Sequence, residues 1–199
     1  MQDFESFNIR QMQVYAGLCL QRFCSHHRID DPLIDELIVH LLEILVATDL
    51  SSWEHDGTYL AITGRGDPIP EVVSNSLSRD TLSNLRSLME SCVEVGMVDM
   101  YGEPTRKPLE FLETCISKLT RSGIPLPAFQ PLKKHKKGTD HWGDSISKSD
   151  FEELLRAYEL ALRNACASQA VGLDLYFAPY KTRAVQPCSI RMSYPPSMT

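Results

Sequence analysis

Hydrophobic residues recur at helical spacing through most of the first 170 residues. Over residues 8–27, apolar side chains follow the i, i+3, i+4 pattern that places them on one face of an amphipathic α-helix. A second helix is expected from residue 32, because Asp31 can cap its first turn and Pro32 suits the first helical position. Its apolar stripe, from Leu33 to Leu45, is broad enough for a helix of the core.

Three further long helices are predicted by the same spacing. Residues 82–95 carry one apolar stripe, and Gly96 is expected to end that helix. Pro108 is expected to begin the next helix and Gly123 to end it. The last long helix is expected to begin near residue 149, because either of two serines there has an acidic residue three positions later, as in a capping box. It is expected to end at Gly172.

The segments between these helices lack a clear period. Residues 49–69 hold three glycines and a proline, which predicts a long connection, followed by a short helical turn over residues 71–77. Three prolines in residues 124–144 favour extended backbone, and alternating apolar residues after 173 suggest a short hairpin. The prediction is an all-α bundle of about five main helices with long connections, as a domain of residues 1–172 with an extension of residues 173–199.

Composition narrows the class of protein. Of the 199 residues, 43% are hydrophobic and 23% are charged, which is ordinary for a soluble globular chain. No apolar run approaches the roughly 18 residues that a membrane span needs, and the first residues are acidic where a secretory signal would be basic. We therefore expect a cytoplasmic protein that does not enter the membrane. The net charge of −6 argues against broad affinity for nucleic acid.

The segment "CLQRFCSHHRIDDP", residues 19–32, resembles a metal site in composition only. Cys19 and Cys24 are five positions apart, about 140° around a helix axis, so an intact helix cannot bring both to one ion. His26 and His27 suit the last turn of a helix, where they can satisfy free carbonyl groups. The expectation is a helix end, with no bound metal and no cofactor. The six cysteines lack paired spacing and are expected to be small buried side chains.

Two other short stretches have ordinary explanations. "GRGDP", residues 64–68, contains the adhesion tripeptide Arg-Gly-Asp, but a glycine turn before a proline accounts for it. "KKHKKGTDHWG", residues 133–143, is the main basic cluster, and nucleic-acid binding through its lysines and Trp142 is one alternative function. A hydrolase or metal-dependent enzyme without a recognisable motif is the other alternative, and no catalytic residue is predicted.

The most informative charge pattern is acidic. Residues 30–64 contain eight acidic residues and no lysine or arginine, whereas solvated helices usually mix the two signs. Two aromatic residues lie in the predicted loop within this stretch, a composition that suits docking of a basic partner by electrostatic steering and aromatic anchors. The predicted partner-binding residues are Asp31, Asp35, Glu36, Trp53, Glu54, Asp56 and Tyr59.

One resemblance adds to this hypothesis. The order "YAGLCLQRFC", "HLLE", "SSWE", "CVEVGMVDMYG" and "GIPLP", over residues 12–145, resembles bacterial α-helical immunity proteins of polymorphic or contact-dependent toxin systems. That resemblance implies a non-enzymatic protein that neutralises a toxin by binding it. The leading expectation is therefore a protein-binding protein whose acidic face covers a basic toxin domain.

Overall fold

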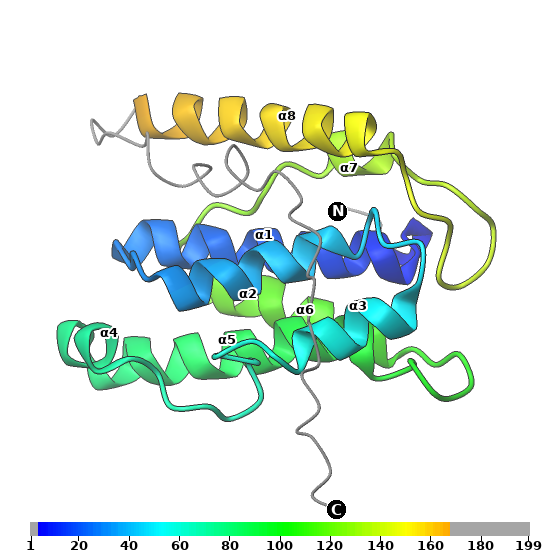
Figure 1. The fold of residues 1–199 in the computed structure, drawn as a ribbon. Helices are drawn as coiled ribbons and strands as arrows, with labels where there is room; N and C mark the ends of the chain where they lie inside the picture. The colour runs from blue at the N-terminus through cyan, green and yellow to red at the C-terminus, as the bar shows by residue number, and fades with distance from the viewer. Residues whose placement is uncertain (1–3, 168–199) are drawn as a thin grey trace, which may run out of the picture. The chain divides into compact units, whose positions relative to one another are not determined.

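The helices of the bundle surround one central helix, α1 (Ile9–His27) (Figure 1). The computed structural model describes the backbone of residues 4–167 and the side chains of residues 4–158. This part of the chain contains eight α-helices, one 3₁₀ turn and no strand, which confirms the predicted all-α bundle. The elements are η1 (Phe4–Ser6), α1, α2 (Pro32–Glu43), α3 (Leu50–Gly57), α4 (Glu71–Ser76), α5 (Arg79–Met97), α6 (Lys107–Arg121), α7 (Gln130–Lys133) and α8 (Lys148–Ala167).

The chain divides into two compact units, Met1–Tyr158 and Glu159–Thr199, and the first carries everything described below. The predicted boundary at residue 172 and the predicted hairpin lie outside the described residues. No described helix has both the length and the apolar character that crossing a membrane requires.

α1 is a central helix, and its polar side is buried as well as its apolar side. It packs against α2, α5, α6 and α7, and every residue from Ile9 to Gln21 is buried. Its polar residues reach the backbone of distant segments. The Arg10 guanidinium donates to the carbonyl oxygens of Ile44, Ala47 and Gly143, and the Gln13 amide donates to Cys92 O. Each of these bonds also satisfies a buried polar side chain of α1, as the interior of a protein requires.

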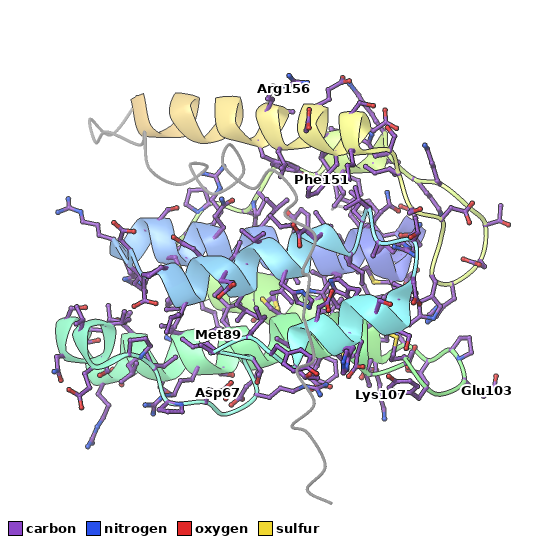
Figure 2. All side chains as sticks on the ribbon, in the orientation of Figure 1. Asp67, Met89, Glu103, Lys107, Phe151 and Arg156 are labelled. Carbon is purple, nitrogen blue, oxygen red and sulfur yellow. The ribbon has the colours of Figure 1, made fainter. Side chains whose placement is uncertain are left out.

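The helix ends follow the predicted local chemistry. The Asp31 carboxylate accepts hydrogen bonds from Leu33 N and Ile34 N at the start of α2, and Ser147 Oγ accepts one from Asp150 N at the start of α8. α1 ends at His27, and Arg28 takes the left-handed conformation that closes it. The interior face of α8 carries Phe151, while Arg156 points away from the bundle (Figure 2).

Two predictions about the connections are wrong. Residues 50–57 form the helix α3, which begins with an Asp49 cap, where a loop was expected. Gly96 was expected to end the third long helix, but α5 continues one residue further, to Met97. A Cβ atom on Gly96 would lie 2.5 Å from Gln13 Oε1 and 3.2 Å from Trp53 Cη2, so the glycine allows α1 and α3 to approach α5 closely.

Candidate functional site

The surface of α3 gathers part of the predicted binding residues. Glu54 and Asp56 lie on α3, and Tyr59 follows it directly, with 75% of its surface exposed. Tyr101, from the connection between α5 and α6, joins them with 78% exposed, and its hydroxyl donates to Glu54 Oε2 at 2.9 Å. The α3 surface, as we call it, consists of Glu54, His55, Asp56, Tyr59 and Tyr101.

Both tyrosines of the α3 surface are held by neighbouring side chains. The Tyr59 hydroxyl lies 3.2 Å from His55 Nε2, and the two rings meet edge to face at 5.0 Å. The bond from Tyr101 to Glu54 raises the pKa of the Tyr101 hydroxyl, because the carboxylate stabilises the protonated phenol. Two large aromatic rings are thus both exposed and oriented, which lowers the entropy cost of ordering them on binding.

Trp53 does not belong to that exposed surface. It is 6% exposed, its ring stacks on His40 at a centroid distance of 4.8 Å, and its indole N–H donates to His40 O at 2.8 Å. The burial follows from α3 being a helix, because Trp53 is the residue on its inward face. The indole anchors α3 to α2, and its burial keeps Trp53 out of the exposed α3 surface.

The remaining predicted acids lie at the other end of α2. Asp31 caps that helix, and Asp35 and Glu36 follow in its first turns, whereas α3 comes after its last turn (Figure 1). Burial, together with the nearby Asp30 and Asp31 carboxylates, raises the pKa of Asp35 to about 6. The acidic run of the sequence therefore forms two groups in space, and only the second adjoins the exposed tyrosines.

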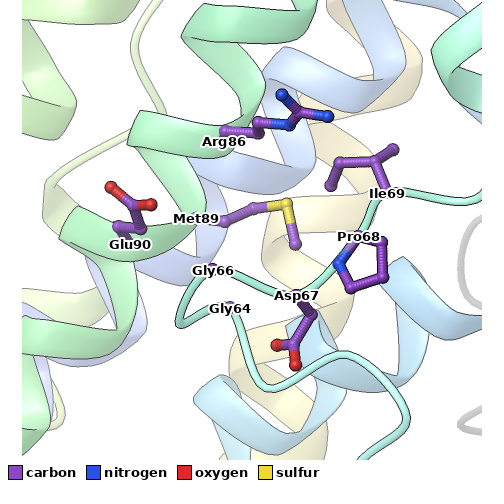
Figure 3. Close-up of a pocket in the computed structure, with 8 residues that line it drawn as sticks. All are labelled: Gly64, Gly66, Asp67, Pro68, Ile69, Arg86, Met89 and Glu90. Atoms are coloured by element: carbon purple, nitrogen blue, oxygen red, sulfur yellow. The ribbon is translucent and has the colours of Figure 1, made fainter.

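The segment after α3, residues 58–70, contributes to the walls of two hollows. The larger hollow has a volume of about 390 Å³, and Figure 3 shows the Met89 thioether reaching from α5 toward the segment 64–69. The guanidinium of Arg86 and the carboxylate of Glu90 point away from that thioether (Figure 3). The smaller hollow, of about 150 Å³, adjoins the α3 surface.

The Arg-Gly-Asp tripeptide forms a closed turn in this segment. The Asp67 carboxylate accepts hydrogen bonds from Thr63 N and Thr63 Oγ1, both at 2.7 Å, and these bonds lower its pKa. Arg65 pairs with Glu94 of α5 at 3.0 Å. Both charged side chains of the tripeptide thus have partners within the chain, as the turn interpretation expects.

The basic loop, residues 133–143, is attached to the bundle. Lys136 Nζ donates to Ser6 O at 2.6 Å, and Lys137 Nζ lies 3.4 Å from Asp150 Oδ2. His141 Nε2 lies 2.9 Å from Asp99 Oδ2, and the buried Asp99 carboxylate also accepts bonds from Thr105 N and Thr105 Oγ1. Burial opposes ionisation of Asp99, but the Thr105 and His141 bonds outweigh it and lower its pKa. These contacts fasten the loop to η1, to α8 and to the α5–α6 connection.

The cysteines follow the sequence expectation within the described residues. Cys19, Cys24, Cys92 and Cys115 are fully buried, and burial raises the pKa of the first three thiols. Cys92 Sγ lies 3.6 Å from Cys115 Sγ and 3.1 Å from Ala16 O. Across the part of the chain with placed side chains, no three histidine, cysteine or acidic residues gather as a metal site would require.

His55 and Tyr101 are the residues of this surface that the sequence analysis did not predict, and Tyr101 lies outside the acidic stretch altogether. Tyr101 comes from a distant part of the chain. It is 47 positions from Glu54, and only the packing of the α5–α6 connection beside α3 brings them together. No protein-family model, curated protein or solved structure matches the chain. We therefore infer function from the geometry of the α3 surface.

Proposed function

We propose that this chain is a cytoplasmic, non-enzymatic protein that binds a basic protein partner through the α3 surface. The supporting observation is the pair of oriented, exposed tyrosines. Among the described residues, the large hydrophobic side chains that are exposed are Tyr59, Val72 and Tyr101, and two of these three lie on this surface. Tyrosine is enriched at the energetic centres of interfaces, because it buries a large rigid area and keeps one polar group.

Charge favours a basic partner. Glu54 and Asp56 lie on the same helix, α3, beside the tyrosines' partners, and residues 30–64 supply no lysine or arginine to neutralise them. Complementary charge raises the association rate and selects partners more than it adds affinity. The similarity to immunity proteins leads us to propose that the partner is a toxin domain, which this chain would neutralise by covering it.

Photo-cross-linking in the native cell tests the surface. A photoreactive phenylalanine analogue at position 59 or at position 101 should give an adduct with the same basic protein. The same analogue at Thr114, which is exposed on α6, should not give that adduct. Different adducts from positions 59 and 101, or an acidic protein from both, would show that the α3 surface is not the docking site.

Charge reversal then measures the electrostatic part. With the cross-linked partner purified, the double variant Glu54→Lys with Asp56→Lys should bind about tenfold more weakly, mainly through a slower association rate. The matched control reverses Glu110 and Glu113, both exposed on α6, and should change affinity by less than about twofold. Co-expression completes the test: the partner should be toxic alone and harmless together with this chain.

A further inference from the structure

The smaller hollow adjoins the α3 surface and has the character of an anchor pocket. Its volume is about 150 Å³, and an apolar cavity of that size can hold a benzene molecule. Glu54, Thr58 and Leu60, which are exposed or half-buried, are among its lining residues, so the pocket borders the α3 surface. Its apolar walls are Leu37, Leu41, Trp53, Leu60, Val93 and Met97.

These walls are fixed by the core. Leu37 and Leu41 are each 1% exposed, so α2 holds them rigidly, and the Trp53 ring is stacked flat on His40. The indole N–H is already donated to His40 O, so the tryptophan presents its ring and not a free donor. Preformed apolar pockets of this kind are where interfaces concentrate binding energy.

The charges at the mouth determine what should enter. Arg65 also lines the pocket, but it pairs with Glu94 at 3.0 Å, which offsets its charge. The Glu54 carboxylate holds one hydrogen bond from Tyr101 and retains further acceptor capacity. A cation beside the entering side chain would therefore meet Glu54, and the acid at Asp56 lies two residues further along α3.

We propose that this pocket receives one apolar side chain, of leucine or similar size, from a basic segment of the protein partner. The inference rests on the proposed function and adds the kind of sequence that the partner presents: an apolar residue flanked by lysines or arginines. The bound side chain would be buried between α2, α3 and α5, and its basic neighbours would face Glu54 and Asp56.

Short peptides test the inference without the natural partner. The probe is the acetylated, amidated pentapeptide Lys-Lys-Leu-Lys-Lys, compared with the same peptide carrying alanine at the centre. Both have the same charge, so the comparison isolates the apolar side chain. We expect the leucine peptide to bind at least about tenfold more tightly, because it buries three additional carbon atoms. Its binding should shift the methyl NMR signals of Leu37, Leu41 and Met97.

A variant that fills the pocket provides the second measurement. Leu60→Trp should remove the preference for leucine over alanine, while Ala61→Trp, an exposed neighbour that does not line the pocket, should keep it. Equal binding of the leucine and alanine peptides to the unmodified protein would overturn the pocket inference, and the proposed function would stand. Equal binding of Glu-Glu-Leu-Glu-Glu would instead overturn the proposed preference for a basic partner and leave the pocket intact.

Discussion

Polar side chains are buried on α1 and exposed on α3, and the two helices use them differently. On α1, the side chains of four polar residues donate hydrogen bonds to backbone carbonyls of segments that lie 34 to 133 positions away in sequence: Arg10, Gln11, Gln13 and Tyr15. On α3, the Glu54 carboxylate is hydrogen-bonded to Tyr101 and the His55 imidazole to Tyr59. Both tyrosines are exposed.

This difference separates residues that hold the fold from residues that are available to a partner. A buried polar group whose bonds reach loop carbonyls cannot be changed without leaving an acceptor unsatisfied, so its role is structural. An exposed group that orients an exposed aromatic ring contributes little to folding. Substitutions on α1 should therefore reduce stability, and those on the α3 surface should reduce binding alone.

The largest effect is expected at Arg10. Arg10→Met keeps the length of the side chain but leaves the carbonyl oxygens of Ile44, Ala47 and Gly143 without this donor. We expect the free energy of unfolding to fall by about 3–5 kcal/mol, measured by urea denaturation. Arg156→Met, on the exposed face of α8, is the control and should change it by less than about 0.5 kcal/mol. A loss at Arg10 no greater than the control would refute the structural role of polar α1 residues.

The second effect concerns His40, which lies where α2 meets α3. Burial lowers the pKa of His40 to about 4, although the Asp56 carboxylate opposes the shift. Because the folded-state pKa is below the ordinary value of 6.5, the contribution of neutral His40 is complete above about pH 6.5. As the pH falls from 6.5 toward 4, this contribution is lost, and the free energy of unfolding decreases by about 2–3 kcal/mol in total.

Denaturant unfolding at a series of pH values checks this prediction with His40→Phe as the comparison. Phenylalanine keeps a ring against Trp53 and cannot be protonated, so its stability should decline less between pH 6.5 and pH 4.5. The raised pKa of Asp35 acts in the opposite direction, since protonation of Asp35 stabilises the fold as the pH falls below about 6. Since Asp35 is present in both proteins, the difference between them isolates His40. Parallel pH profiles would contradict a buried, neutral His40.

The sequence predicted the long helices because their signals are local. Asp31, Pro32 and Ser147 occupy the predicted ends of α2 and α8, and each acts through residues within three positions. α3 was missed because an eight-residue helix with one buried side chain produces no visible period. The Asp49 cap was the one available signal for it.

Features that depend on tertiary packing could not be read from the sequence in this way. Nothing near Arg10 in sequence indicates that carbonyl groups 34 and more positions away accept its hydrogen bonds. Tyr101 belongs to the α3 surface through a contact across 47 positions. The exposed part of the candidate site, Glu54, Asp56 and Tyr59, was predicted because charge and aromatic content are properties of one short segment.

The third effect is expected at Gly96, where α1 and α3 both meet α5. Gly96→Ala would press a methyl group against the buried Gln13 amide and the Trp53 ring, at 2.5 and 3.2 Å. We expect a loss of about 1–3 kcal/mol in the free energy of unfolding. Gly102→Ala is the matched control, because nothing lies within 4 Å of the added carbon. If the two substitutions cost the same, the close approach of the helices at Gly96 is not required.

The smallest effect on stability is expected at the exposed tyrosines, where the effect on binding should be clear. Tyr59→Ser and Tyr101→Ser should each move the thermal unfolding midpoint by less than about 2 °C, because the removed rings are about three-quarters exposed. Each should nevertheless weaken binding of the basic leucine peptide several-fold, as measured by NMR titration.

Tyr101→Phe separates the two contributions of that residue, since it keeps the ring and removes the bond to Glu54. If Tyr101→Phe binds like the unmodified protein and Tyr101→Ser does not, the ring supplies the contact. If both are equally weak, orientation by Glu54 is what the partner needs. A shift in the unfolding midpoint as large as that of Gly96→Ala would show instead that the α3 surface helps to hold the fold, and the distinction between the two helices would fail.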